Sequence, residues 1–265
     1  MDQKSLEDSL AGLPLERIAY FDSVGSTNDI VGDWAKRGQQ GIGLAVANEQ
    51  SAGRGRAGRQ WFTPAGSALA FSLLMPVEPL VDLGKMASTA GLPSLAVCQA
   101  MENLYKLSPE IKWPNDVLLD GKKMCGVLAE AHWSGERLQT LIYGIGINIA
   151  PKSVPQEEKV NFPATCLEDE LGRSVKRDEL LRTVLERLFW LQEQGRSSQF
   201  IRAWESRLAF KDQDVRLKDD KGNVTEGSVL GLDREGGIRL QTNSNEAKVF
   251  QAGEIQLRPF IDNKV

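Results

Sequence analysis

The pattern of apolar residues changes near residue 209, and this change constrains the fold more than any other feature of the chain. Before it, stretches with helical spacing alternate with short apolar runs. After it, only short alternating runs remain, separated by polar turns. The later pattern is typical of a small antiparallel β-barrel. We therefore predict two domains, over residues 1–208 and 209–265. Strands of the second are expected at Val215–Lys218, Thr225–Leu230, Ile238–Gln241 and Lys248–Gln251.

The first 208 residues combine strand and helix patterns, so this part is predicted to be an α/β or α+β domain. Asp120-Gly121 favours a tight hairpin turn, and Pro93 is expected to break the helix that contains it. Strands are expected at Arg17–Asp22, Gly43–Glu49, Ala68–Met75, Glu110–Trp113, Val117–Leu119, Lys123–Ala131 and Thr140–Ile149. Helices are expected from Ser26 to about Arg37, and at Leu83–Leu107, Thr165–Leu171, Asp178–Gln194 and Ser198–Arg207.

The charge balance argues against a surface built to bind nucleic acid or anionic membrane. The net charge is -4, so any polyanion site must be a local concentration of cations. Residues Met1–Pro14 form neither a signal peptide nor a spanning helix. The three cysteines Cys98, Cys125 and Cys166 are far apart and show no metal or disulfide spacing. We expect a cytoplasmic protein that binds neither membrane nor nucleic acid.

A single histidine, His132, limits the possible catalytic mechanisms. Serine–histidine or cysteine–histidine nucleophilic catalysis would have to use it, and so would a histidine-rich metal site. Its neighbours suggest the end of a strand, so we interpret it as a turn or surface residue.

A loop rich in glycine and arginine follows the second predicted strand. Gly53, Gly55 and Gly58 satisfy G-x-G-x-x-G, which is weak alone because no helix opens after the third glycine. The loop also carries three arginines within six residues. Glycines let backbone approach a ligand closely, and arginines bind phosphate or carboxylate. A solvated basic loop, or one that touches RNA, explains the loop alone equally well.

Four further segments carry groups suited to ligand binding, and each has a plain structural alternative. Ser26-Thr27-Asn28 can hold a polar head group, or only cap a helix. Lys112-Trp113-Pro114-Asn115-Asp116 places a cation, an aromatic ring and an acid together, as a ligand site would, or is only a turn with polar side chains. Lys123 lies near Gly126, where a ligand can approach, or is a hairpin lysine in water. Gly144-Ile145-Gly146-Ile147-Asn148 leaves one strand face bare, for a ligand or for closely packed backbone.

Together these segments resemble the biotin–protein ligase family and occur in the family's order. The resemblance covers nearly the whole chain from about residue 17, and the arginine loop and the Lys-Trp-Pro-Asn-Asp segment are highly specific in combination. It implies a catalytic domain with a mixed sheet similar to class II aminoacyl-tRNA synthetases, followed by an SH3-like barrel. The matching motifs are Ser26-Thr27-Asn28, Gln50, Gly53-Arg54-Gly55-Arg56-x-Gly58-Arg59 with Trp61, Lys112–Asp116, Lys123-x-x-Gly126, Gly146-Ile147-Asn148 and Gly253-Glu254-Ile255-x-Leu257-Arg258.

The resemblance also implies the reaction. Biotin and ATP form biotinyl-5′-AMP with magnesium present, and biotin is then transferred to a lysine of a biotin carboxyl carrier protein. Arg56 and Lys123 correspond to the catalytic pair that holds the carboxylate and the α-phosphate. Asp116 would orient Lys112 or the magnesium; direct metal ligands stay unknown. Biotin contacts are implied for Ser26, Thr27, Asn28, Gln50, Gly53, Arg54, Arg56, Lys123 and Gly126. ATP contacts are implied for Arg56, Arg59, Trp61, Lys112, Asn115, Asp116, Asn148 and Arg258.

Some features depart from the family pattern. Ala57 stands where some members carry another arginine, and we expect this to tune retention of the intermediate. Fewer than about 20 residues precede the first predicted strand, too few for a DNA-binding domain of usual size, so we expect a ligase without repressor activity. The rival hypotheses are a lipoate or octanoate ligase, and a non-enzymatic biotin-sensing or RNA-binding module. The expected carrier belongs to acetyl-CoA carboxylase, and the chain is expected to be a monomer or a homodimer.

Overall fold

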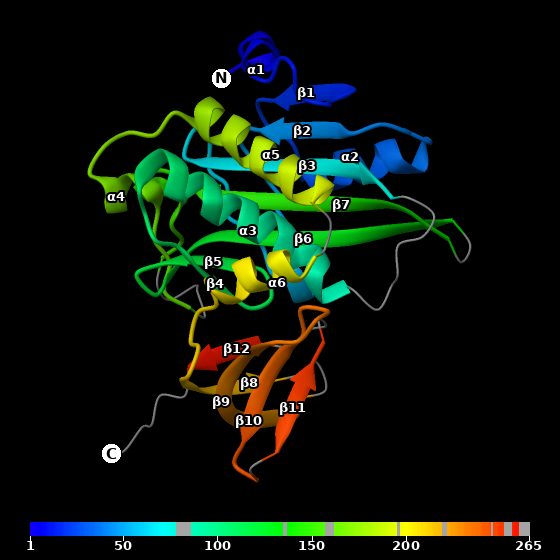
Figure 1. Cartoon of the computed structure of the whole chain (residues 1–265). Helices are drawn as coiled ribbons and strands as arrows, with labels where there is room; N and C mark the ends of the chain where they lie inside the picture. The colour runs from blue at the N-terminus through cyan, green and yellow to red at the C-terminus, as the bar shows by residue number, and fades with distance from the viewer. Residues whose placement is uncertain are drawn as a thin grey trace.

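A seven-stranded mixed sheet forms the larger part of the molecule (Figure 1). The computed structural model describes residues 1–77, 86–134, 137–156, 162–194, 197–218, 222–244, 246–251 and 256–259. The strand order is β1-β2-β3-β7-β6-β5-β4, in which β1 pairs with β2 in parallel and the other neighbours are antiparallel. The strands are β1 (Arg17–Phe21), β2 (Gly43–Ala47), β3 (Ala68–Pro76), β4 (Glu110–Lys112), β5 (Asp116–Leu119), β6 (Lys122–Ser134) and β7 (Arg137–Asn148).

Helices cover both faces of this sheet. The long helices α3 and α5 pack against each other on one face, and α2 packs on the other (Figure 1). The helices are α1 (Gln3–Ser9), α2 (Thr27–Lys36), α3 (Met86–Tyr105), α4 (Leu167–Leu171), α5 (Arg177–Glu193) and α6 (Ser198–Glu205). None of the helices in the described part of the chain is long and apolar enough to cross a membrane.

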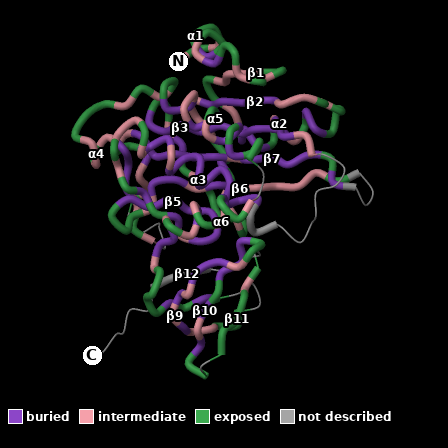
Figure 2. Tube along the Cα trace, in the orientation of Figure 1, coloured by how far each residue is buried: buried purple, intermediate pink, exposed green. Residues whose placement is uncertain are grey.

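The central strands send alternate side chains to opposite faces, as the period of a strand requires. On β3, Leu73 belongs to the main core with α3 and α5, whereas Leu74 packs with Val31 and Trp34 of α2. Figure 2 shows the buried residues concentrated in the central strands and in the helices that cover them. The short helix α2 faces only part of its side of the sheet, which leaves room there for a site.

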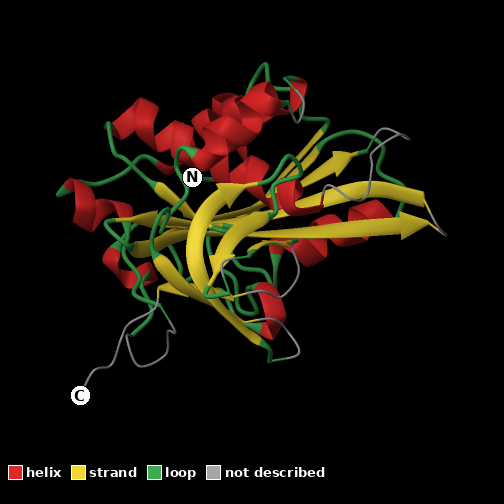
Figure 3. Ribbon diagram, turned by 60° about the horizontal axis from the view of Figure 1, so that its bottom comes forward, coloured by secondary structure: helices red, strands yellow, loops and turns green. Residues whose placement is uncertain are grey.

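The C-terminal part is a five-stranded antiparallel sheet with strongly curved strands (Figure 3). Buried and exposed residues alternate along β8, as predicted for a half-buried strand. Residues 206–213 lie between α6 and β8, and the proposed domain boundary at 209 falls within this connection. The order is β11-β10-β9-β8-β12, from β8 (Asp214–Lys218), β9 (Val224–Leu232), β10 (Ile238–Thr242), β11 (Ala247–Phe250) and β12 (Gln256–Pro259).

Most of the predicted elements are present, with three differences. The break predicted at Pro93 is wrong, because α3 is continuous through it. A proline removes one helical hydrogen bond, and burial of Leu92 and Leu95 on either side holds the helix in place. Helix α1 and strand β12 were not predicted, because they carry too few apolar residues in a periodic pattern. The predicted hairpin is confirmed, with positive φ at Asp120 (45°) and Gly121 (71°).

Candidate active site

A cavity of about 430 Å³ opens on the face of the sheet that carries α2. The register places Gly126 opposite Gly146, and Gly144 opposite Ser72, so small residues line this face across three strands. The predicted bare face is therefore present, and it lies beneath the cavity. Among the predicted site residues whose side chains the structure describes, all except Gly53 line the cavity: Ser26, Thr27, Asn28, Gln50, Arg54, Arg56, Arg59, Trp61, Lys112, Asn115, Asp116, Lys123, Gly126 and Asn148.

The N-terminus of α2 forms one wall of the cavity. Ser26 is the N-cap residue, with extended backbone, and Thr27 is the first helical residue. The backbone N–H of Thr27 donates to Gln50 Oε1 at 2.8 Å, and the Thr27 hydroxyl lies 3.1 Å from the same oxygen. Gln50 Nε2 lies 3.3 Å from Thr63 Oγ1, which fixes the amide in one orientation. This wall therefore offers uncharged donors and acceptors.

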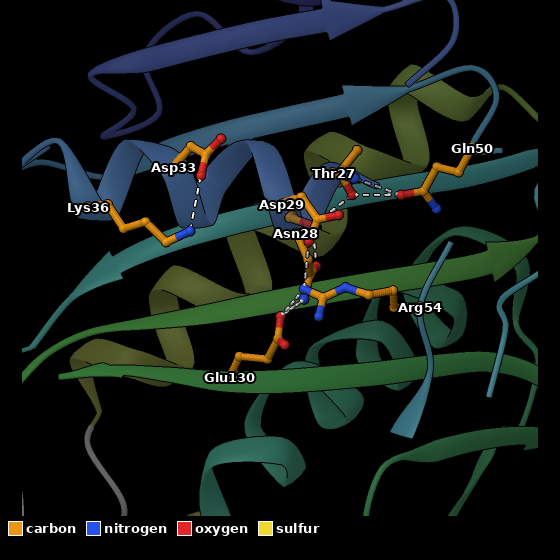
Figure 4. A network of polar contacts seen from close by, with 9 residues as sticks. Thr27, Asn28, Asp29, Asp33, Lys36, Gln50, Arg54 and Glu130 are labelled. Atoms are coloured by element: carbon orange, nitrogen blue, oxygen red, sulfur yellow. Dashed lines mark hydrogen bonds and ion pairs between the residues drawn. The ribbon is translucent and has the colours of Figure 1, made fainter. Parts of the chain in front are cut away.

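A chain of polar groups continues from Thr27 across the sheet, buried at Thr27, Ser72 and Asn28 and partly exposed at Glu130 and Arg54 (Figure 4). The Thr27 and Ser72 hydroxyls are 2.7 Å apart, and Ser72 Oγ donates to Asn28 Oδ1 at 2.5 Å. Asn28 Nδ2 donates to Glu130 Oε2 at 2.6 Å, and Arg54 Nη2 lies 2.9 Å from the same oxygen. Ser72 and Glu130 were not among the predicted site residues. The only signal for Ser72 was a hydroxyl within an otherwise apolar strand.

The glycine–arginine loop lies along the cavity as a tight turn. Gly55 N–H donates to Arg59 O at 2.7 Å, and Ala57 (φ 54°) and Gly58 (φ 70°) adopt left-handed backbone between them. Arg56 Nη1 donates to Asn115 Oδ1 at 3.1 Å. Arg54 lies 3.0 Å from Asp29 as well as beside Glu130. The arginines thus lie in different places, one beside α2 and one beside the Lys-Trp-Pro-Asn-Asp segment.

Trp61, at the end of this loop, lies over two glycines of the sheet. A Cβ on Gly126 would be 3.1 Å from the Trp61 ring, and a Cβ on Gly146 would overlap the indole. Its indole Nε1 is buried and has no hydrogen-bond partner among the described residues. A Cβ on Gly53 would overlap the Trp61 carbonyl, so Gly53 supports the loop behind the cavity. The unpartnered N–H is a donor that a ligand could use.

Two lysines share one buried carboxylate at the opposite wall. Asp116 Oδ1 is 2.7 Å from Lys123 Nζ, and Asp116 Oδ2 is 3.5 Å from Lys112 Nζ. Burial acts to raise the pKa of Asp116, but the ammonium groups of Lys123 and Lys112 outweigh it and lower that pKa. Lys112 also lies 4.8 Å from the Phe162 ring centre, and Lys123 lies 5.5 Å from that of Trp61. Both lysine side chains are therefore held in place by the Asp116 carboxylate and by an aromatic ring.

Asn148, Arg258 and the possible metal site remain among the predictions for the site. Asn148 is buried, and its Nδ2 donates to Thr165 O at 3.0 Å. Arg258 lies in β12, where its backbone pairs with Arg216, but its side chain is outside the described residues. Among the described residues, no group of three or more histidine, cysteine or acidic side chains could hold a metal ion. Both Asp116 oxygens face lysines, so this carboxylate does not fit a role as a direct ligand.

Cations gather beside Gly126, whereas hydroxyl and amide groups gather beside Gly144, where Arg54 is paired with Asp29 and Glu130. Among the described residues that line that end of the cavity, the guanidinium of Arg56 and the ammonium groups of Lys112 and Lys123 face one carboxylate, that of Asp116. Such an arrangement can hold two anionic groups close together. The other end suits a neutral head group with both donors and acceptors.

Family models match both parts of the chain. The biotin/lipoate A/B protein ligase family model matches residues 20–148, and the biotin protein ligase C terminal domain model matches residues 212–258. A bifunctional ligase/repressor BirA of Bacillus subtilis is 31% identical over 242 residues, which are 89% of this chain and 73% of the relative. A biotin–[acetyl-CoA-carboxylase] ligase of Paracoccus denitrificans is 30% identical over 225 residues, covering 82% and 91% of the two chains.

Solved structures are similar in the same way. The biotin protein ligase from Aquifex aeolicus in complex with biotin and ATP superposes with a TM-score of 0.77 at 31% identity. The match covers 92% of this chain and 100% of that one. These similarities confirm the predicted fold class, a mixed-sheet domain similar to class II synthetases followed by an SH3-like barrel.

Proposed function

The chain belongs to the biotin/lipoate A/B protein ligase family and is a biotin protein ligase enzyme, and on this premise we propose that it attaches biotin to a carrier protein in two steps. The observation that carries the proposal is the division of one cavity between a neutral polar end and a cationic end. Biotin has a neutral ring system and a carboxylate tail, and the two ends suit these two parts.

In the proposed first step, a biotin carboxylate oxygen attacks the α-phosphorus of ATP and pyrophosphate leaves. Two anions must approach each other, so the barrier falls when fixed cations offset their charge. Arg56 and Lys123 are proposed for this role, because Arg56 is held by Asn115 and Lys123 by Asp116. Charge developed in the transition state then meets groups that need little reorganisation. Neither a protein nucleophile nor a histidine is required.

In the proposed second step, the amine of a carrier lysine attacks the acyl carbon of biotinyl-adenylate, and AMP leaves. The acceptor is a biotin carboxyl carrier protein; relatives named biotin–[acetyl-CoA-carboxylase] ligase support this choice. The mixed anhydride must be kept from water, and an ordered glycine–arginine loop above it would do so. Magnesium is proposed to accompany ATP on its phosphates, because the described residues offer no protein-held site for it.

The proposed roles of the other residues follow their positions in the cavity. Groups near α2 and Gly144 are proposed to bind the biotin ring: Ser26, Thr27, Asn28, Gln50 and Arg54, with Gly126 giving room and Gly53 supporting the loop. Groups near Asp116 are proposed to bind ATP: Arg59, Lys112, Asn115, Asp116 and Asn148. Trp61 lies between the two sets, and the ATP role of Arg258 stays a prediction.

The proposal is tested by biotin-dependent exchange of labelled pyrophosphate into ATP, with magnesium present. Exchange with biotin and none with lipoate is expected. Exchange with lipoate alone would favour the rival lipoate ligase, and no exchange from a folded, biotin-binding protein would favour a sensor. Transfer is then checked by mass spectrometry of a purified carrier domain, using a variant that lacks the acceptor lysine as control.

Three further expectations accompany this proposal. The chain is a monomer or homodimer, which sedimentation with and without biotin checks. It acts in the cytoplasm, where its proposed carrier and ATP occur. It does not repress transcription; a DNA-binding measurement with biotin and ATP present checks this, and the net charge of -4 supports it.

A further inference from the structure

Three links of hydrogen bonding join Gln50 to Asn28, but the groups along them carry only two hydroxyl hydrogens. The links run from Gln50 Oε1 to Thr27 Oγ1, to Ser72 Oγ, and to Asn28 Oδ1, at 3.1, 2.7 and 2.5 Å. Thr27 and Ser72 can donate one hydrogen each. Both ends of the run are amide oxygens, which only accept. One link must therefore lack a hydrogen, and the neighbours decide which.

Glu130 decides the direction of the run. Its Oε2 accepts from Asn28 Nδ2 at 2.6 Å, and a carboxylate cannot donate when ionised. The Asn28 amide is thereby fixed with its oxygen toward Ser72. Arg54 Nη2 lies 2.9 Å from the same Glu130 oxygen, which holds the carboxylate against Asn28.

The orientation of Asn28 then determines which hydroxyl donates at Ser72 and at Thr27. Asn28 and Ser72 are buried, so their 2.5 Å contact requires the hydrogen of Ser72. The 2.7 Å contact between Ser72 and Thr27 must in turn use the hydrogen of Thr27. Gln50 Oε1 is satisfied by the backbone N–H of Thr27 at 2.8 Å. Thr27 lines the cavity, and with its hydrogen used in this way its hydroxyl can offer a ligand only an acceptor.

We propose that Glu130 is a positioning residue which, through Asn28 and Ser72, fixes the Thr27 hydroxyl as a hydrogen-bond acceptor for an N–H group of the ligand. This inference rests on the proposed function, since the ureido ring of biotin carries N–H donors. A dithiolane ring, as in lipoate, carries none, so a fixed acceptor at Thr27 favours the ureido ligand. Glu130 itself need not touch the ligand.

The test is equilibrium titration of biotin, and separately of ATP, into the full chain. Glu130→Ala and Ser72→Ala each remove one member of this series of hydrogen bonds, so the Thr27 hydroxyl is no longer fixed as an acceptor. Each variant is expected to weaken biotin binding roughly tenfold. Glu130→Gln keeps an oxygen for the Asn28 and Arg54 donors, so it is expected to bind biotin nearly as wild type does. The double variant Glu130→Ala/Ser72→Ala is expected to lose no more affinity for biotin than the more impaired single variant does, because both residues act through the same series of hydrogen bonds. Asp33→Ala is the control, because it removes an exposed carboxylate from α2, the helix that carries Thr27 and Asn28.

The results separate this inference from the proposed function. If wild-type protein binds no biotin, both are overturned. If it binds biotin and Glu130→Ala binds equally well, only the role of Glu130 is overturned. Losses that multiply in the double variant, or that affect ATP as strongly as biotin, would show general damage to the fold and also overturn it. Thermal unfolding of each variant shows whether the fold survives.

Discussion

Trp113 Nε1 donates a hydrogen bond of 2.8 Å to the carbonyl oxygen of Gly236, and this bond ties the Lys-Trp-Pro-Asn-Asp segment to the C-terminal sheet. Trp113 is only 1% exposed, and Gly236 is buried in the turn between β9 and β10. The segment that carries Lys112, Asn115 and Asp116 is thus fixed by a residue of the other part of the chain. The position of the cations therefore depends on how the C-terminal sheet docks.

Trp113→Phe tests this coupling. The phenyl ring keeps most of the apolar contact but leaves a buried carbonyl without its donor, which costs about 1–3 kcal/mol. We expect a loss of that size in the free energy of unfolding, measured with urea. Trp133→Phe, at a position that is 40% exposed, is the matched control and should be nearly neutral. Equal stability of the two variants would show that the bond contributes little.

Lys123→Met tests the proposed catalytic cation. Methionine keeps an apolar stem against Trp61 but removes the ammonium group that lies 2.7 Å from Asp116. Losing one well-placed group that stabilises transition-state charge typically costs about 2.7–4 kcal/mol. We expect kcat for biotin-dependent pyrophosphate exchange to fall roughly 10²–10³-fold. Lys248→Ala, an exposed lysine of β11, should keep the wild-type rate, and a near-normal rate in Lys123→Met would remove Lys123 from the mechanism.

The depressed pKa of Asp116 predicts a specific dependence of stability on pH. Because the pKa in the folded protein lies below that of the unfolded chain, ionised Asp116 stabilises the fold above the unfolded pKa of about 3.9. That contribution is lost as the pH falls through the folded pKa. Asp116→Asn should therefore be less stable than wild type at neutral pH, and the difference should shrink below about pH 4. Asp33→Asn, at an exposed ion pair, should show little difference at any pH.

Local sequence patterns predicted much of the site, but they could not predict which residues meet across the sheet. The start of α2 at Thr27 and the bare glycines of β7 follow from residue types within a few positions. The role of Ser72 depends on its register with Gly144, a residue 72 positions later in the chain. Glu130 of β6 likewise meets Asn28 only because α2 packs over β2, β3 and β7, and β7 pairs with β6. Periodicity shows which face a residue occupies, but not which distant side chain meets it there.

Gly146→Ala tests whether the bare face is needed for binding. A Cβ at this position would overlap the indole of Trp61, which would have to leave its place above the sheet. Since Trp61 and Gly126 border the same part of the cavity, biotin binding should weaken strongly while the sheet still forms. Gly32→Ala is the matched control, because its Cβ would meet only Ile142 at 3.9 Å and alanine favours the interior of α2. Titration calorimetry with biotin compares the two. Unchanged affinity in Gly146→Ala would mean that Trp61 can move without loss, and the ligand would then not depend on its position.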